Sequence, residues 1–429
     1  MMVLVIHIVK DGDTPYSIAQ EYGVSLSGLI ADNGLAAYAY LPVGLAVVVA
    51  SDTVRYTVKQ GDSLYTIARE YDTTVRRILE ANPRLNENAQ LAIGQQITVP
   101  LGRDIRGSLD INGFAYPSIA DQVLQNTLPF LTYLSVFSYS VNEDGTLVDI
   151  NDDAVLDRIA GTNVTPMMVV TNIEPGGGFS SDRLQNLFAN SAAVSDLVDN
   201  IINTMEDKGF TALNVDFEYV YQANREDYNN FLRTLKERFL PLGYILTSSV
   251  APKLSANQQG LLYEAHDYAA HGEICDYVII MTYEWGFAYG PPLPVAPIGS
   301  VEDVIKYAVS EIPSEKILMG IPNYGYDWVL PYRPGTAART LSLSNCVQIA
   351  IQENTDIMFD NVSQSPFLSY YDMNGQEHIT WFEDARSIQA KLELIEKYNL
   401  AGPSYWTVMT YFAPNWTLIR TQYDVRKNI

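Results

Sequence analysis

Eight short apolar runs, spaced along residues 108–429, constrain the fold of this chain more than any other feature. Helix-length segments such as residues 181–208, 225–239 and 301–311 lie between most of them. A strand followed by a helix, repeated eight times over this length, predicts an α/β fold of the (β/α)8 or TIM-barrel class. The expected strands are residues 111–115, 133–138, 167–171, 213–218, 245–250, 277–282, 317–322 and 402–407.

The gap between the seventh and eighth expected strands is longer than one helix requires. Residues 329–382 contain short alternating runs and an Asn374-Gly375 pair, which favours a tight hairpin turn. We therefore expect a small α+β insertion that walls one side of the barrel mouth, where such barrels keep their active sites. All five tryptophans lie between Trp285 and Trp416, and sugars stack on aromatic rings, so this distribution favours a carbohydrate cleft.

The first hundred residues contain an internal repeat. Residues 7–19 align with residues 56–68, so that Gly12 corresponds to Gly61, an offset of 49 positions. Each copy has the pattern of a strand, a capped amphipathic helix, a second helix ending near an asparagine, and a glycine turn into a Val/Ile-rich strand. The repeat predicts two βααβ modules, at residues 5–51 and 55–101. Residues 103–108 are expected to link them to a domain spanning residues 108–429.

Composition excludes several classes of partner. The net charge of −23 at pH 7 argues against nucleic acid or an anionic membrane surface. Cys275 and Cys346 are too far apart for a metal-type spacing, so we expect no disulfide framework, no metal and no cofactor. Residues 1–9 are apolar but lack a basic segment and a cleavage site, so no signal peptide is expected. We also expect no membrane span and a monomeric protein.

Residues 211–218 combine a strand pattern with acidic side chains. At period two, one face carries Leu213, Val215 and Phe217, and the other carries Asn214, Asp216 and Glu218. An edge strand on the surface would show the same alternation, but the hydrophobic flanks favour a buried strand. Because buried carboxylates are costly unless they are paired or used in chemistry, the second face predicts a functional site.

The two modules resemble LysM domains, and the match covers nearly all of residues 5–100. Such domains bind N-acetylglucosamine polymers, chiefly peptidoglycan and chitin, in a groove between the loop after the first strand and the loop before the last strand. The resemblance therefore implies a glycan partner such as peptidoglycan. By position it implicates Gly12, Asp13, Thr14 and Asn33 in the first module, and Gly61, Asp62, Ser63 and Asn82 in the second.

Residues 108–429 resemble family 18 glycoside hydrolases. The family signature on the fourth strand is Asp-x-x-Asp-x-Asp-x-Glu, whose positions here hold Thr211, Asn214, Asp216 and Glu218, so the last two acids are kept. Asn214 cannot share a proton with Asp216 as an aspartate would, which leaves the pH optimum open. The resemblance also includes residues 281–283, 320–325, 381–384 and 406.

The resemblance implies a mechanism in which the 2-acetamido oxygen of the sugar attacks the anomeric carbon. Glu218 would protonate the leaving oxygen and then activate water, and therefore needs a raised pKa. Asp216 would orient the acetamido group, Tyr283 would hold its oxygen, and Trp406 would form the floor beneath the sugar. Further substrate contacts are expected from Asn214, Glu284, Trp285, Asn323 and Tyr324.

The combination of both halves resembles the spore cortex-fragment-lytic enzymes of the SleL/YaaH type. That resemblance implies an N-acetylglucosaminidase that acts on cortex peptidoglycan during germination, is located in the spore and retains the β configuration. Three alternatives stay open: a chitinase of the same mechanism, a glycan-binding protein without activity, and a product that rearranges instead of being hydrolysed. The sequence predicts no preference between whole cortex and cortex fragments.

Overall fold

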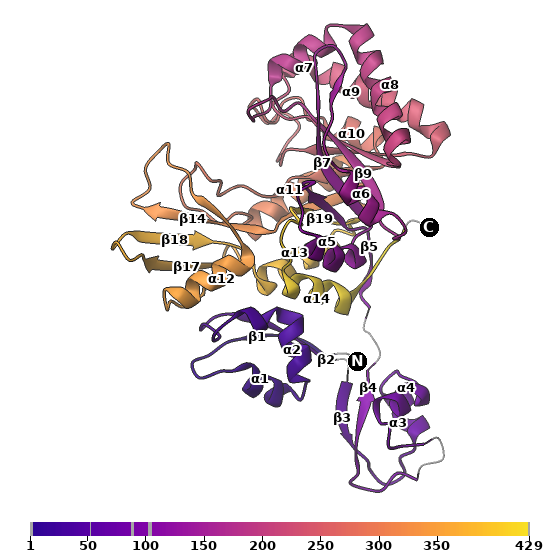
Figure 1. The fold of residues 1–429 in the computed structure, drawn as a ribbon, viewed down its shortest axis with the longest axis vertical. Helices are drawn as coiled ribbons and strands as arrows, with labels where there is room; N and C mark the ends of the chain where they lie inside the picture. Colours follow the sequence, from indigo (N-terminus) through magenta and orange to yellow (C-terminus); the bar gives the residue numbers. More distant parts are fainter. Residues whose placement is uncertain (1–2, 52, 87–89, 102–104, 428–429) are drawn as a thin grey trace.

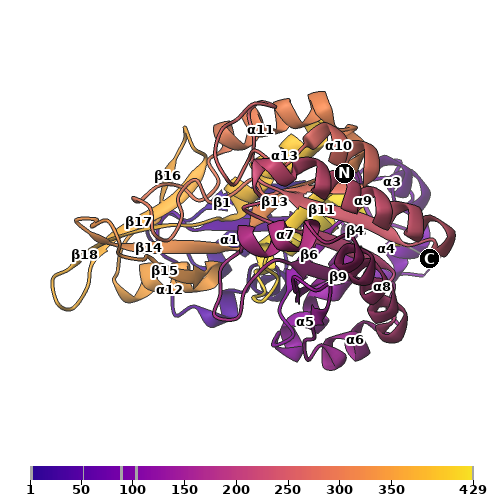
Figure 2. The same cartoon turned by 90° about the horizontal axis from the view of Figure 1, so that it is seen from above.

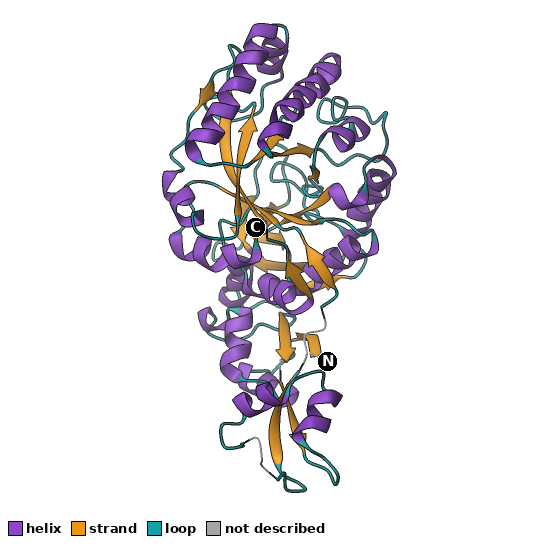
Figure 3. Ribbon diagram, turned by 90° about the vertical axis from the view of Figure 1, so that its right-hand side faces the viewer, coloured by secondary structure: helices purple, strands orange, loops and turns teal. Residues whose placement is uncertain are grey.

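Eight parallel strands close into a barrel in the computed structural model, which describes residues 3–51, 53–86, 90–101 and 105–427 (Figure 1). The pairing of the first strand with the second closes the ring, and helices surround it (Figure 3). The predicted TIM barrel is therefore confirmed. In chain order its strands are β6 (Asn112–Ala115), β7 (Tyr133–Val141), β9 (Thr165–Thr171), β10 (Ala212–Asp216), β11 (Ile245–Val250), β12 (Tyr277–Ile280), β13 (Ile317–Pro322) and β19 (Gly402–Trp406).

Amphipathic helices cover the outside of the barrel because the outward faces of the strands are apolar. Phe217, for example, is fully buried and stacks on Phe231 at a centroid distance of 5.7 Å. The segment expected as one helix at residues 181–208 is two helices, because Asn190 caps a new N-terminus. The helices are α5 (Asp121–Thr127), α6 (Asp153–Ile159), α7 (Ser181–Phe188), α8 (Ser191–Lys208), α9 (Arg225–Phe239), α10 (Tyr268–Ile274), α11 (Ile298–Glu311), α13 (Ala385–Lys397) and α14 (Ala413–Gln422).

An α+β insertion follows the seventh barrel strand and projects from one side of the barrel (Figure 2). Its sheet begins at Tyr324, directly after β13, rather than near residue 329. Asn374 and Gly375 form the turn between its last two strands, and Gly375 has the left-handed φ of +73° that glycine adopts freely. The strands are β14 (Tyr324–Leu330), β15 (Arg339–Ser342), β16 (Met358–Asp360), β17 (Ser365–Tyr371) and β18 (Glu377–Trp381), and the helix is α12 (Leu343–Gln352).

Two βααβ modules precede the barrel, as the repeat predicts. Thr14 and Ser63 cap the first helix of each module through equivalent capping boxes. The first module packs on the barrel, whereas the second lies at the far end of the molecule (Figure 3). Their elements are β1 (Val3–Ile8), α1 (Pro15–Tyr22), α2 (Leu26–Asn33) and β2 (Ala46–Ser51), then β3 (Thr53–Thr57), α3 (Leu64–Glu70), α4 (Val75–Ala81) and β4 (Gln96–Pro100).

Short β-strands at both ends of the barrel domain, β5 (Gly107–Leu109) and β20 (Tyr423–Val425), pair in parallel. Residues 103 and 104 of the expected linker lie outside the described residues. Within the part of the chain that is described, no helix is both long and apolar enough to cross a bilayer.

Candidate active site

Strand β10 carries the two acids of the site toward the interior of the barrel. It ends at Asp216, and Glu218 follows two residues later, at the carboxyl end of the strand where barrel enzymes place their chemistry. Asn214 and Asp216 are buried and face inward, whereas Val215 and Phe217 pack beneath the helices. The alternation read from the sequence therefore separates a polar inner face from an apolar outer face.

A cavity of about 360 Å³ opens above these acids. Asp216, Glu218, Tyr283, Glu284 and Trp406 all line it, which brings together side chains from β10, the segment after β12, and β19. Aromatic side chains form much of the remaining wall. They are Phe114, Tyr116, Phe137, Phe179 and Tyr219.

Burial and like charge act together on the two acids. Burial is the main cause that raises the pKa of Glu218 well above its ordinary value, and the charges of Asp216 and Glu284 add to it. Burial likewise raises the pKa of Asp216 to about 7, against a hydrogen bond from Ser249 that favours its charged form. A carboxyl whose pKa is raised in this way keeps the proton that transfer to a leaving group requires.

Asn214 holds Ser249 beside Asp216. Its amide nitrogen Nδ2 donates to Ser249 Oγ at 3.0 Å, while its Oδ1 accepts from Thr247 Oγ1 at 2.8 Å. An aspartate at this position could share a proton with Asp216 directly. Asn214 instead fixes the hydroxyl that faces Asp216.

The peptide groups on both sides of Glu218 are bound by side chains from neighbouring loops of the barrel. The amide of Asn172, which follows β9, accepts from Glu218 N at 3.0 Å and donates to Glu218 O at 2.9 Å. His266 Nε2 lies 2.9 Å from the carbonyl of Phe217, and its Nδ1 accepts from Ala251 N at 2.9 Å. Because β10 has already ended here, these contacts replace the missing strand ladder and fix the position of the catalytic candidate.

Glu284 and Tyr283 enter the cavity from the segment after β12. Glu284 has a left-handed φ of +68°, and its Oε1 accepts from Tyr324 at 3.0 Å and from Tyr326 at 2.8 Å. The ring of Tyr283 lies against Gly320, where an added Cβ would come within 2.7 Å of it. Glycine at that position therefore allows Tyr283 to reach the cavity.

The remaining expected contacts lie outside the cavity lining. Asn323 Nδ2 donates to the carbonyls of Thr407 and Thr410, so it supports the segment after Trp406. Tyr324 is buried and reaches the site through Glu284, while Trp285 packs against the barrel core. Trp328 and Trp416 are core residues as well, so among the tryptophans only Trp406 lines this cavity.

Other residues set aside by the sequence analysis are structural. Cys275 and Cys346 are buried free thiols. His266 and His271 are buried, and their rings are 6.3 Å apart. No group of acidic, histidine or cysteine side chains in the described part of the chain has the arrangement of a metal site.

The module residues singled out by position hold their own loops. Asp13 and Asp62 accept from the backbone amides of Lys10 and Lys59. The equivalent side chains of Asn33 and Asn82 bond the backbones of Val48 and Thr98. Their engagement inside the modules leaves the loops, including Gly12, Thr14, Gly61 and Ser63, as the expected glycan contacts.

Asn172, Ser249 and His266 are the polar residues of the site that the sequence analysis missed. Ser249 lies on β11, Asn172 follows β9, and His266 precedes α10. Each reaches the site through a contact with a residue that is distant in the sequence. A polar residue at the carboxyl end of an apolar run is the signal that could have identified Asn172.

The barrel, the acid pair on its fourth strand and the two modules define a class of protein. Residues 115–410 match the family model of glycosyl hydrolases family 18, and residues 7–49 and 56–100 each match the LysM domain. The chain therefore belongs to glycosyl hydrolases family 18 and carries two LysM domains, which confirms both resemblances.

Particular relatives are similar over three quarters of the chain or more. The chain is 38% identical to the cortical fragment-lytic enzyme of Bacillus anthracis over 98% of both chains. It is 44% identical to the cortical fragment-lytic enzyme of Bacillus subtilis strain 168 over 76% of both chains. The crystal structure of the Bacillus cereus spore cortex-lytic enzyme SleL matches with a TM-score of 0.84 and 38% identity, covering 99% of each chain.

Proposed function

We propose that this glycoside hydrolase is a spore cortex peptidoglycan hydrolase, an N-acetylglucosaminidase that acts during germination and is located in the spore. The observation that carries the proposal is the pair of Asp216 and Glu218, which lines one cavity together with Tyr283 and Trp406 and in which the pKa of Glu218 is raised. Similarity to cortical fragment-lytic enzymes along the whole chain supports the choice of cortex as substrate.

The proposed reaction uses the substrate as its own nucleophile. Glu218 protonates the glycosidic oxygen while the acetamido oxygen of the same sugar attacks the anomeric carbon, so the leaving sugar departs as an alcohol. Asp216 accepts a hydrogen bond from the acetamido N–H and balances the positive charge of the oxazolinium ion. Glu218, now a carboxylate, removes a proton from water. The water attacks the anomeric carbon and opens the oxazolinium ring, with net retention of the β configuration.

The mechanism restricts which sugar occupies the reacting subsite. A muramic lactam has no free acetamido group and cannot react in this way, and we propose N-acetylglucosamine as the sugar that reacts. Trp406 supports this sugar from below, and Tyr283 holds the acetamido oxygen. Glu284 contributes to the raised pKa of Glu218.

We propose a division of the chain into LysM domains at residues 5–51 and 55–101 and a catalytic domain at residues 108–429. The LysM part of the chain supplies attachment to the insoluble glycan, and the catalytic domain cleaves it. Attachment raises the local concentration of enzyme at the substrate without changing the chemistry of the site.

To test the proposal, the wild-type protein and the Glu218→Gln variant are incubated with cortex fragments from a muramidase-type digestion and with chitin oligomers, and the products are identified. We expect new reducing-end N-acetylglucosamine from cortex fragments, detected by mass and reducing-end labelling, and a loss of at least about a hundredfold in Glu218→Gln. Cleavage of chitin oligomers but not of cortex would make the protein a chitinase. A product lacking the added water would show rearrangement, and equal turnover by both proteins would refute the site assignment.

A further inference from the structure

The two LysM domains occupy different environments although their sequences repeat. The first domain shares one continuous hydrophobic core with the barrel. The second domain has its own small core, which includes Tyr56, Ile67, Ile78 and Val99. Figure 1 shows the same difference, with the first domain beneath α12 and α14 and the second domain extending away from them.

Contacts from the barrel domain cover one of the two loops that form a LysM groove in the first domain. This loop, residues 34–45, precedes the last strand. Hydrogen bonds bind this loop to the barrel domain: Tyr40 donates to Ile351 O at 2.9 Å, Gln348 to Ala37 O at 2.8 Å, Ile357 N to Val43 O at 2.9 Å, and Arg386 to Gly44 O at 3.2 Å.

The helix before this loop is fixed as well. Thr417 of α14 donates to Asp32 O at 2.8 Å, and Arg420 forms an ion pair with the Asp32 carboxylate. Around Asn33, Leu45 and Phe412 the seam between the first domain and the barrel contains a cavity of only about 10 Å³, so the two surfaces are close-packed there. A larger cavity of about 480 Å³ lies farther along the seam, where Leu4 and Ile6 of β1 face α13 and α14.

Equivalent positions of the second domain are open. Ile93 is 71% exposed, whereas its counterpart Val43 is partly buried. A Cβ added to Gly94 would have nothing within 4 Å, whereas a Cβ on Gly44 would lie 1.9 Å from Ile357 O. The end of this loop next to the last strand, residues 41–45, is therefore covered in the first domain, and the equivalent residues are accessible in the second.

The sequences of the last strands agree with this difference. In β2, Ala46, Val47, Val48 and Val49 are all buried, because both faces of the strand are covered. In β4 the positions corresponding to Ala46 and Val48 are Gln96, which is exposed, and Thr98, which is partly buried. Loss of the polar alternation in β2 is what a strand buried on both faces requires.

We infer that the first LysM domain is a structural part of the catalytic domain whose glycan groove is closed by the barrel, and that the second LysM domain binds the N-acetylglucosamine glycan. This division rests on the proposed function for the identity of the glycan. The first copy of the module then fixes the insertion against the barrel, and the second copy attaches the protein to its substrate.

A matched pair of substitutions tests the structural role in the full-length protein. Gly44→Ala and Gly94→Ala impose the same backbone strain, because the φ angles are +84° and +83°, but only Gly44→Ala meets the barrel. We expect Gly44→Ala to lower the melting temperature of the catalytic domain by about 4 °C or more and Gly94→Ala to leave it unchanged. Equal shifts in the two variants, or no shift in either, would overturn the structural role.

Counting binding sites tests the attachment role. The Glu218→Gln protein, titrated calorimetrically with an N-acetylglucosamine tetramer, should bind two molecules, one in the cleft and one on the second LysM domain. Adding Ile93→Asp, at an exposed position, should leave one site. Two sites remaining would show that the first domain binds glycan and would overturn the inference. An empty cleft with an intact Ile93-dependent site would refute the proposed catalytic function and leave the inference standing.

Discussion

At the scale of single residues, the position of Glu218 depends on side chains that come from other strands. Asn172 binds both the N–H and the C=O of Glu218, and His266 binds the preceding carbonyl. A displacement of a general acid by about 1 Å can cost a hundredfold in rate, so in the proposed mechanism such contacts contribute to catalysis without touching the sugar. Asn172 and His266 are positioning residues.

Asn172→Asp tests this positioning because it preserves shape and replaces the donor to Glu218 O with an acceptor. We expect kcat to fall about 10- to 100-fold with KM changed less than about threefold. Asn126→Asp, at an exposed position on α5, is the control and should behave as wild type. If Asn172→Asp raised KM and left kcat unchanged, Asn172 would act in binding and not in positioning.

The raised pKa of Glu218 also makes stability depend on pH. Below the ordinary value of 4.5, the carboxyl is protonated in the folded and the unfolded chain. Above it, the unfolded chain releases the proton while the folded chain keeps it, so the free energy of unfolding falls as pH rises. Glu218→Gln should therefore be more stable than wild type at pH 7 and equal to it near pH 4. Thermal melts at both pH values check this, and a difference that does not change with pH would contradict it.

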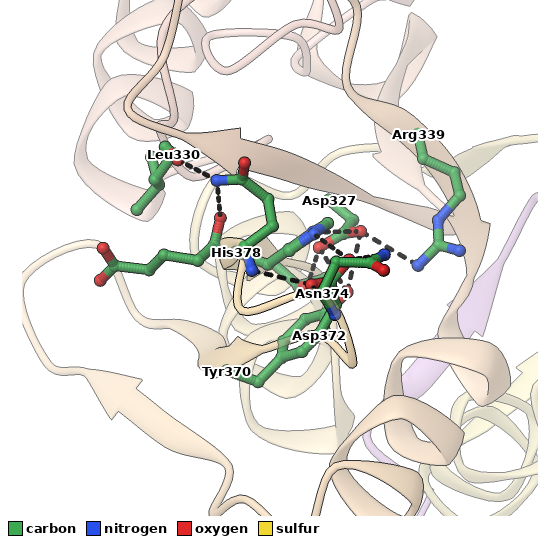
Figure 4. A network of polar contacts seen from close by, with 10 residues as sticks. Asp327, Leu330, Arg339, Tyr370, Asp372, Asn374 and His378 are labelled. Carbon is green, nitrogen blue, oxygen red and sulfur yellow. Dashed lines mark hydrogen bonds and ion pairs between the residues drawn. The ribbon is translucent and has the colours of Figure 1, made fainter.

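At the scale of elements, the insertion sheet is organised around one buried carboxylate. Asp327 on β14 accepts from Thr380 at 2.8 Å, Arg339 at 3.0 Å and Tyr370 at 3.1 Å, and His378 Nδ1 lies 3.2 Å away (Figure 4). These partners come from β15, β17 and β18, so Asp327 connects most strands of the insertion. The same strand β14 carries Tyr324 and Tyr326, which hold Glu284 in the cavity.

Asp327→Ala should destabilise the protein because it leaves several buried donors without an acceptor. We expect a loss of about 3 kcal/mol in the free energy of unfolding, measured by denaturant titration. Asp356→Ala, at an exposed position in the same insertion, is the control and should change stability by less than about 0.5 kcal/mol. Equal stability of the two variants would show that the Asp327 network is dispensable.

The helices and strands could be predicted where burial determines which residue types a segment contains. Barrel strands are covered on both faces, so runs such as residues 245–250 and 317–322 were identified with the observed bounds. The break between α7 and α8 was missed because Asn190 is a single polar residue inside an otherwise helical pattern. Asp216, Glu218, Tyr283 and Trp406 were found through their motifs, whereas Ser249 and His266 act through contacts that no short sequence pattern encodes.

At the scale of the whole molecule, the attachment of the first LysM domain to the barrel was not predicted. The two repeats have similar helix caps and turns, so local sequence makes them equivalent. The apolar composition of β2 is the sequence feature that reflects this packing, because α14 covers the strand. Removal of both LysM domains would expose this apolar face, which is why point substitutions in the full-length chain are the sharper tests.

In the proposed mechanism, Glu218 acts together with the acetamido group of the substrate. The configuration of the first product distinguishes this mechanism from direct attack by water, and proton NMR can follow it during cleavage of N-acetylglucosamine oligomers or cortex fragments. We expect the β anomer to appear first and to mutarotate afterwards, because two successive inversions occur at the anomeric carbon. Initial release of the α anomer would show direct attack by water and would contradict the proposed mechanism.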